Sequence, residues 1–176
     1  MTKSTLSLAD VQERLTRVGV DWPTSAPHPA GNYVPFRLHN GIGFLAAQTS
    51  GLDGLFSGQV GRDLSVEIGQ KAAARAAVFA LYRIHEALAG FERLVGLLHV
   101  AGHVCSAEGF REQPRVLDGA SNLFRAALGD RGLHSRTAYG PTQIVGDLVI
   151  ELEITFAYAE TMTRGRRGRG EAASRG

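Results

Sequence analysis

The segment Leu148–Tyr158 constrains the fold of this chain more than any other part of the sequence. Apolar residues occupy every second position, and the intervening positions include Glu151, Glu153 and Thr155. Successive side chains of a strand point to opposite faces of a sheet, so this alternation predicts a strand with one apolar and one polar face. The chain must therefore place a hydrophobic layer against one side of this strand.

Two more strands and a tight turn are predicted nearer the N-terminus. Residues 33–38 and 42–46 are apolar runs that flank a turn containing Asn40-Gly41, and Asn-Gly in this position is a strong hairpin signal. Residues 7–10 have a capping-box pattern, which predicts the start of a short amphipathic helix. Three prolines in residues 22–29 exclude a helix or a central strand there, so we expect an extended connector.

Two long helices and a third strand are predicted in the middle of the chain. An alanine-rich apolar stripe indicates a helix that Asp63 or Ser65 caps and that ends near Ala89. A second amphipathic helix is expected from about residue 110 to residue 128, and the apolar run at 94–105 indicates a strand between the two helices.

A fourth strand beginning at Arg136 completes the order helix, two strands, long helix, strand, long helix, two strands. This order predicts an α+β sandwich in which both long helices pack on one face of a mixed sheet. The polar side of the last strand would lie on the other face. We expect a partner subunit to cover that face.

The charge distribution limits the classes of partner. The formal net charge is +2, but five arginines and one glutamate lie between Thr163 and Gly176, which leaves 14 basic and 16 acidic residues in the rest of the chain. An acidic body gives no electrostatic argument for nucleic-acid binding, and only the tail could contact phosphates weakly. We predict three segments: an N-terminal helix and proline-rich extension (1–27), an α+β domain (28–160) and a disordered Arg/Gly-rich tail (161–176).

The single cysteine, Cys105, excludes an intrachain disulfide and fits a reducing compartment. The N-terminal residues contain no apolar signal core, and no run is long enough to span a membrane. We therefore expect a cytoplasmic protein with no membrane partner.

Arg136 and Glu151 are the residues with the clearest chemical potential. The arginine offers a rigid fork of donors that suits a carboxylate, and a glutamate on a strand can orient a water or take a proton. Together they could bind a small carboxylated molecule and act on it hydrolytically. The structural alternatives are a surface arginine paired with an acid, and an exposed glutamate or an intersubunit ion pair between these two residues.

Short motifs between His28 and Tyr158 match one known family. They are Gly31-Asn32-Tyr33, Ala46-Ala47-Gln48, Asp118-Gly119-Ala120-Ser121, Ser135-Arg136 and Val149-Ile150-Glu151. With these motifs, and with the spacing from Arg136 to Glu151, the chain resembles the Rid family. These are the reactive-intermediate deaminases once named YjgF or L-PSP endoribonucleases, and the likeness is to a branch with a longer N-terminus.

The resemblance implies a chorismate-mutase-like fold, assembled as a ring-shaped homotrimer with clefts between subunits. It implies that Arg136 binds the substrate carboxylate, while Glu151 and a backbone carbonyl hold the water that attacks an enamine or imine carbon. Ammonia would leave and a 2-keto acid would remain, without a metal or organic cofactor. Tyr33 becomes a second candidate catalytic residue, and Gln48 and Asp118 become candidate substrate-binding residues, with Gln48 expected mainly to support the backbone.

The sequence also departs from the family pattern, because the usual serine is Ala46 and the usual asparagine is Asp118. Three hypotheses stay open: a hydrolytic enamine/imine deaminase, a trimeric module that binds a small carboxylated metabolite without turnover, and an endoribonuclease or translation inhibitor. We place the first ahead, because Arg136 and Glu151 are both present. The last is least favoured, because the body is acidic.

Some residues invite other interpretations. His99, His103 and Cys105 resemble metal ligands, but on a strand His99 and His103 would lie about 13 Å apart, too far to share one ion. We therefore expect no metal site. Tyr33 could instead be a core aromatic residue at the start of a strand.

Overall fold

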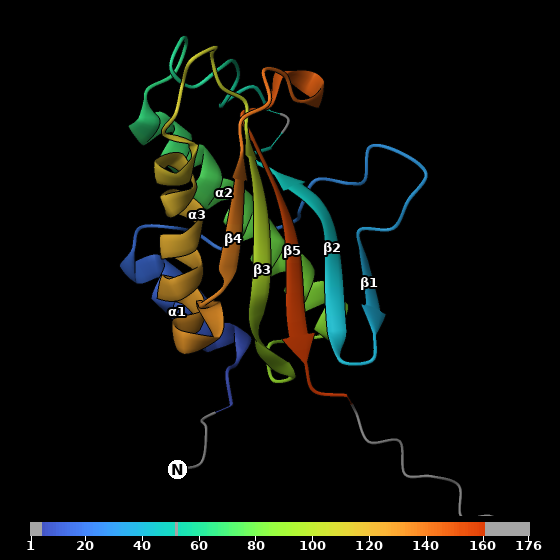
Figure 1. Cartoon of the computed structure of the whole chain (residues 1–176). Helices are drawn as coiled ribbons and strands as arrows, with labels where there is room; N and C mark the ends of the chain where they lie inside the picture. Colours follow the sequence, from blue (N-terminus) through green and yellow to red (C-terminus); the bar gives the residue numbers. More distant parts are fainter. Residues whose placement is uncertain (1–4, 52, 161–176) are drawn as a thin grey trace, which may run out of the picture.

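A computed structural model describes residues 5–51 and 53–160 (Figure 1). The predicted tail at 161–176 lies outside the described residues. The chain forms a five-stranded sheet with three α-helices on one side of it (Figure 1). This confirms the predicted α+β sandwich with both long helices on one face. Among the described residues, no helix is long and apolar enough to span a membrane.

The sheet is mixed, as expected. Its strands are β1 (Phe36–His39), β2 (Ile42–Thr49), β3 (Leu94–Val104), β4 (Ser135–Tyr139) and β5 (Ile150–Tyr158). Their order across the sheet is β1-β2-β5-β3-β4, with β3 and β4 parallel and the other neighbours antiparallel. The strand with the clearest alternation, β5, therefore lies at the centre, where it needs a buried face.

The β1–β2 hairpin forms at the predicted turn. Asn40 and Gly41 both have positive φ angles, 46° and 77°. A two-residue turn with positive φ at both positions matches the right-handed twist of the flanking strands. The Asn-Gly pair therefore sets the register that places Phe36 opposite Leu45.

The helices begin where side-chain caps were expected. Helix α1 (Leu8–Arg17) has the complete capping box of Ser7 and Asp10, and Ser65 caps the long helix α2 (Val66–Leu88). Helix α3 (Gln113–Leu128) starts three residues later than predicted, because Pro114 near its first position has no N–H to donate.

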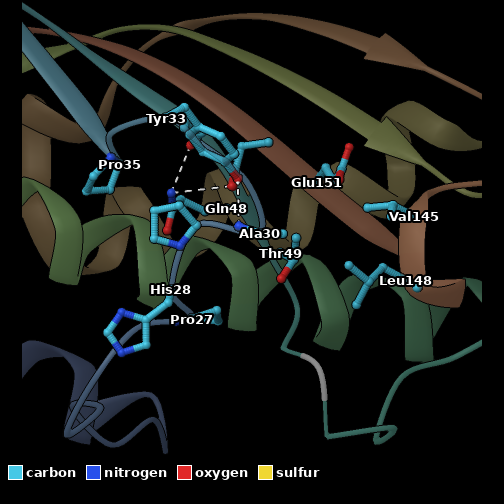
Figure 2. Close-up of a pocket in the computed structure, with 14 residues that line it drawn as sticks. Pro27, His28, Ala30, Tyr33, Pro35, Gln48, Thr49, Val145, Leu148 and Glu151 are labelled. Atoms are coloured by element: carbon cyan, nitrogen blue, oxygen red, sulfur yellow. Dashed lines mark hydrogen bonds between the residues drawn. The ribbon is translucent and has the colours of Figure 1, made fainter.

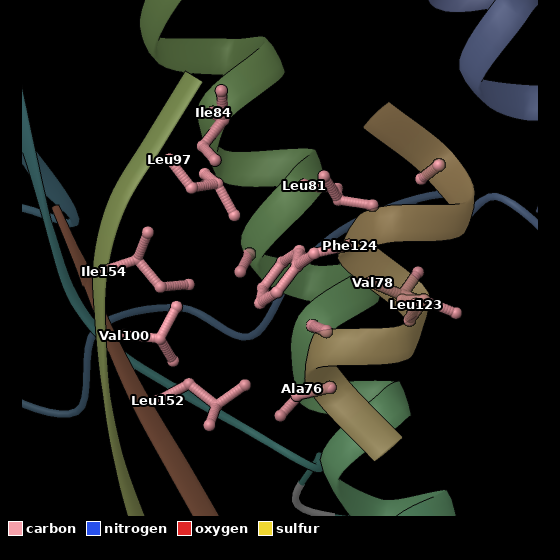
Figure 3. Close-up of a cluster of buried hydrophobic side chains, with 14 of the residues drawn as sticks. Ala76, Val78, Leu81, Ile84, Leu97, Val100, Leu123, Phe124, Leu152 and Ile154 are labelled. Carbon is pink, nitrogen blue, oxygen red and sulfur yellow. The ribbon is translucent and has the colours of Figure 1, made fainter. Parts of the chain in front are cut away.

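The core lies between the sheet and helices α2 and α3. Leu97, Val100, Leu152 and Ile154 point from β3 and β5 toward the helices (Figure 3). The facing side of α2 is mostly small, and its alanines at positions 72, 73, 76, 77 and 80 have no exposed surface. Small residues let the helix approach both the sheet and α3 closely. Helix α1 adds two fully buried residues, Val11 and Leu15, to the same cluster.

The other face of the sheet carries no helix. Phe44 lies opposite Thr155 on this face and Tyr139 lies opposite His103, and the side chains of Phe44 and Tyr139 are about half exposed, at 51% and 49%. We call this side, which also carries Glu151 and Glu153, the open face. The charged side chains on this face confirm the predicted polar side of the last strand, and its cover by a partner subunit stays a prediction.

Helices α2 and α3 lie so close together at Gly119 that a larger residue there should destabilise the protein. A Cβ at this position would lie 2.1 Å from the backbone oxygen of Gln70 on α2, so Gly119→Ala must push the helices apart. Overpacking costs about 1–3 kcal/mol, and for a chain of this size we expect the melting temperature to fall by roughly 2–10 °C. Asn122→Ala, at an exposed position of the same helix, is the matched control. Equal melting temperatures for the two variants would contradict this packing.

Candidate functional site

A cavity of about 130 Å³ lies beside the open face, where the N-terminal extension meets β2 and β5 (Figure 2). Tyr33 and Pro35 lie on one side of it in this view, and Glu151, Val145 and Leu148 lie on the other. Three of the five predicted site residues line this cavity: Glu151, Tyr33 and Gln48. The sequence motifs that contain them are far apart in the chain, and the sheet brings them together.

Glu151 is the only acidic residue among those that line this cavity within the described chain. Cross-strand pairing places Glu151 between Thr49 of β2 and His103 of β3. Burial raises the pKa of the Glu151 carboxyl above its ordinary value; the His103 charge opposes this rise and the charge of Glu153 adds to it. A carboxyl with a raised pKa is a better proton acceptor than an ordinary one.

A β-bulge shapes the cavity wall opposite Glu151. The register of β2 against β5 shifts between Leu45 and Gln48, so Ala46 and Ala47 share the space that one residue would normally occupy. Both alanines line the cavity. The buried amide of Gln48 donates to the carbonyl oxygens of Ala46, at 2.8 Å, and Ala47, at 3.4 Å. In this structure Gln48 therefore supports the backbone of the bulge, the role expected for it.

Tyr33 lies before β1 rather than in the core. Its side chain is 52% exposed, and its hydroxyl accepts a hydrogen bond from the Ala30 backbone N–H at 3.2 Å. The alternative of a core aromatic residue is therefore wrong. The ring lines the mouth of the cavity, where an apolar face and a hydroxyl are both available to a ligand.

Arg136 lies outside this cavity, at the edge strand β4. Its Nη1 donates to Asp118 Oδ1 at 3.0 Å and to Ser121 Oγ at 2.9 Å, and its Nη2 donates to the Pro114 carbonyl oxygen at 3.0 Å. All three partners belong to α3. The arginine is thus paired with an acid, as the structural alternative predicted, and the partner is the candidate residue Asp118.

These three contacts use Nη1 and one N–H of Nη2. The Nε–H donates to no residue that the structure describes, and Nη2 has a second N–H, so two donors stay available to a ligand. The Arg136 side chain is 22% exposed, so these donors can be reached. They can bind a carboxylate while Asp118 keeps its bond to Nη1.

A histidine completes the support of Arg136. His134 Nδ1 lies 2.7 Å from the Gly132 carbonyl, so Nδ1 carries the proton and Nε2 accepts from Ser121 Oγ at 3.0 Å. Burial lowers the pKa of His134, and the nearby charge of Arg136 acts in the same direction. A neutral His134 therefore directs the Ser121 lone pairs toward the arginine.

The sheet separates Arg136 from Glu151. Arg136 lies beside Val100 of β3, which faces the helices, whereas Glu151 lies beside His103, three residues further along the same strand. Residues an odd number apart on a regular strand point to opposite faces. One chain therefore does not bring together the two residues that the sequence suggested would act jointly. A site containing both must use two copies of the chain.

Sequence reasoning missed two neighbours of these residues. His103 was considered only as a metal ligand, but it lies next to Glu151, stacks on Tyr139 with ring centroids 4.9 Å apart, and has a buried Nδ1 without a partner in the described chain. His134, which directly precedes the Ser135-Arg136 motif, was not singled out as a candidate. The sequence did contain a signal for His103. Strand alternation places it on the same face of the sheet as Glu151, so the two could have been expected to be neighbours.

The raised pKa of Glu151 predicts that this residue costs stability. Between the ordinary glutamate pKa and the raised one, the folded chain keeps a proton that the unfolded chain has lost. Stability therefore falls as the pH rises through that window, and it stays lower above it. Glu151→Gln should raise the melting temperature at pH 7 by up to about 3 °C, a small effect because the group is only partly buried.

This gain should disappear as the pH falls below the ordinary glutamate pKa, where both states are protonated. Glu153→Gln, at an exposed position of the same strand face, is the control and should change the melting temperature much less. A thermal melt of each variant across the acidic range checks the sign. A loss of stability in Glu151→Gln at pH 7 would contradict the burial effect.

Known proteins share this architecture. The family model described as "YjgF/chorismate_mutase-like, putative endoribonuclease" matches residues 12–160. Protein TCP17 of Trypanosoma cruzi is 31% identical over 153 residues, which cover 85% of this chain and 95% of the relative. The structure of Atu1372 from Agrobacterium tumefaciens, a protein of unknown function, is 29% identical. It superposes with a TM-score of 0.79 over 86% of this chain and 94% of that one.

RidA from a Psychrobacter species is a more distant structure. It is 17% identical, with a TM-score of 0.51 over 76% of this chain and 94% of that one, and so shares the fold alone. The family match spans the extension, the sheet and both long helices. On that match, the chain belongs to the YjgF/chorismate mutase-like family.

Proposed function

We propose that the protein hydrolyses small imino or enamine acids to a 2-keto acid and ammonia. The observation that carries this proposal is the Glu151 cavity, in which a partly buried carboxyl with a raised pKa faces a mostly apolar space closed by Tyr33. Such a carboxyl is a better proton acceptor than an ordinary one, and the enclosed space limits competition from bulk water.

Arg136 supplies the substrate carboxylate site in this proposal. Its Nε–H and the second N–H of Nη2 suit a carboxylate, and Asp118, Ser121 and the Pro114 carbonyl fix the plane of the guanidinium beforehand. Because Arg136 and Glu151 face opposite sides of one sheet, each site takes the arginine from one copy and the glutamate from another. A ring-shaped homotrimer gives every copy the same two roles and covers the open face.

The chemistry follows from these positions. Glu151 accepts a proton from a water as its oxygen forms a bond to the imine carbon of the substrate. That proton passes to the nitrogen, which gives a carbinolamine with a hydroxyl and an amino group on one carbon. Glu151 then takes the hydroxyl proton and delivers it to the nitrogen, so the carbon–nitrogen bond breaks with ammonia as the leaving group while a lone pair on oxygen completes the new carbonyl. One water is consumed, and one ammonia and one 2-keto acid are released, with no net oxidation. Arg136 holds the carboxylate, and its positive charge makes the neighbouring carbon a better electrophile.

Binding without turnover is the second candidate function. The bulge presents the methyl groups of Ala46 and Ala47 to the cavity, so no hydroxyl from these positions can help to hold a water. Asp118 also places a negative charge 3.0 Å from the Arg136 guanidinium, which opposes an incoming carboxylate. Both features favour a weaker, non-catalytic site for a small carboxylated metabolite.

A ribonuclease activity fits the chain less well. Outside its arginine-rich tail the chain has 14 basic and 16 acidic residues, so the body does not attract RNA. The described part of the cavity wall includes one histidine, His28, and no lysine or arginine. Within its described lining, one chain therefore supplies this cavity with no lysine or arginine for a phosphate, and Arg136 of a second copy would be the single cation there.

Separate substitutions at Arg136 and Glu151 should separate binding from turnover. Arg136→Ala removes the carboxylate fork and should weaken keto-acid binding roughly ten- to a hundred-fold. Glu151→Gln keeps the shape of the cavity but removes the proton acceptor, so kcat should fall by about 10²–10⁴ while keto-acid affinity is kept. An imino acid generated in the assay gives the rate, and calorimetry with a keto acid gives the affinity.

Asp118→Asn is the matched control for the binding arm. It keeps an oxygen that accepts from Arg136 but removes the opposing charge, so keto-acid binding should tighten. If the wild type binds keto acids through Arg136 but accelerates no imino-acid hydrolysis, the non-catalytic module is correct. If neither affinity nor rate depends on Arg136, both candidate functions are wrong.

A further inference from the structure

The proline-rich extension, which we define as residues 22–30, is docked on helix α2. Trp22 packs on Tyr82, His85 and Phe91, with ring centroids 5.9, 5.8 and 6.0 Å away. The Tyr82 hydroxyl donates to the Thr24 carbonyl at 3.4 Å. The extension therefore begins at an aromatic anchor on the long helix.

Arg83 provides the second anchor. Its Nη2 donates to the carbonyl oxygens of Pro27, at 2.6 Å, and Ala26, at 3.3 Å, and its Nη1 pairs with Glu86 at 2.5 Å. The Arg83 side chain is only 7% exposed. Burying an arginine is costly unless its donors are used. Nη1 and Nη2 are used here, whereas Nε has no partner in the described chain, and the two Nη2 bonds fix the path of the extension at Ala26 and Pro27.

The residues that follow this anchor form a wall of the Glu151 cavity. Pro27, His28, Pro29 and Ala30 all line it, and the Ala30 N–H also bonds the Tyr33 hydroxyl. The rest of the lining is largely apolar and includes Ala46, Ala47, Val145 and Leu148. Within the described chain the lining contains no lysine or arginine.

We propose that the extension, held in place by Arg83, builds a specificity pocket that selects acids with an uncharged, apolar side chain of up to about six carbon atoms. This rests on the proposed function, in which Arg136 of a second copy holds the carboxylate. An apolar cavity of about 150 Å³ accepts a benzene molecule, and the cavity here, at about 130 Å³, is slightly smaller. A second carboxylate would meet Glu151 and would find no lysine or arginine in the described lining.

The test uses the whole chain and a series of keto acids: pyruvate, 2-oxobutyrate, 2-oxopentanoate, 4-methyl-2-oxopentanoate and 2-oxoglutarate. Each buried methylene should raise the affinity of the wild type about fourfold until the cavity is full. The charged 2-oxoglutarate should bind more weakly than 2-oxopentanoate, which has the same number of carbon atoms. Calorimetry gives the dissociation constants.

Arg83→Met removes the anchor but keeps most of the apolar stem. It should flatten the rise in affinity with chain length and leave pyruvate binding within about twofold of the wild type, since Arg136 is untouched. Glu86→Gln is the control, because it removes the ion pair but leaves Arg83 to bond the two carbonyls, and it should keep the wild-type series. Arg83→Lys retains a donor and should restore part of the chain-length dependence.

A second measurement on the wild type covers the case in which Arg83→Met does not fold. Binding of 4-methyl-2-oxopentanoate should slow amide hydrogen exchange in peptides spanning residues 22–33 more than pyruvate does at equal saturation. If keto acids bind with no chain-length gain and no such protection, the specificity pocket is wrong and the proposed function stands. If the wild type binds no keto acid at all, the proposed function fails, and the pocket assignment fails with it.

Discussion

The fold depends on strand β5, which places every second side chain in the hydrophobic core. The other strands and the helices pack around this strand. Leu152 and Ile154 face the helices at the centre of the sheet and are buried. The positions of these two neighbours in the chain therefore place Glu151 on the open face. A slip of one residue would bury Glu151 and Glu153 and expose the apolar set, so register here is specified strongly.

The same alternation places Arg136 on the helix side, where α3 supplies Asp118 and Ser121. The separation of the two chemical groups is thus a property of the sheet itself. In the function we propose, one chain carries each half of the site on a different side of the sheet, and a second copy is needed to complete it. The same assembly would cover side chains such as Phe44 and Tyr139, which are half exposed in one chain.

Most of the buried polar atoms that lack a hydrogen-bond partner in the described chain belong to residues near the candidate site. The buried atoms without a partner in the described chain are Ser50 Oγ, Arg83 Nε and His103 Nδ1. Two of these residues adjoin the site, since His103 pairs with Glu151 and Arg83 anchors the cavity wall. An unsatisfied buried polar atom costs about 1–3 kcal/mol. The core itself follows local rules closely, so these departures are concentrated where function is expected.

Local patterns in the sequence predicted most of the elements. Alternation predicted β5, Asn40-Gly41 predicted the hairpin, and Ser65 predicted the start of α2, because each signal depends on neighbours in the chain. Strand order and the parallel pairing of β3 with β4 were not predicted, since they depend on contacts between distant segments.

The sequence predicted which residues are candidates for the site, but not how they are arranged in space. The motifs singled out Arg136 and Glu151 and implied clefts between subunits, but they did not show that the two residues face opposite sides of one sheet. The bulge at Ala46 could not be predicted from the local hydrophobic pattern. The same holds for the hydrogen bonds of Arg83, whose partners lie 56 and 57 residues away in the chain. Docking of the extension therefore needed the structure.

The central claim is that each site takes Arg136 from one copy and Glu151 from another. The most direct measurement refolds Arg136→Ala and Glu151→Gln together in equal amounts and assays imino-acid hydrolysis at a substrate concentration where each variant alone has little activity. Random assembly gives a fully equipped site at about one position in four, so about a quarter of the wild-type activity should return. Native mass spectrometry confirms that mixed oligomers have formed. Mixed oligomers with no recovered activity would contradict the shared site.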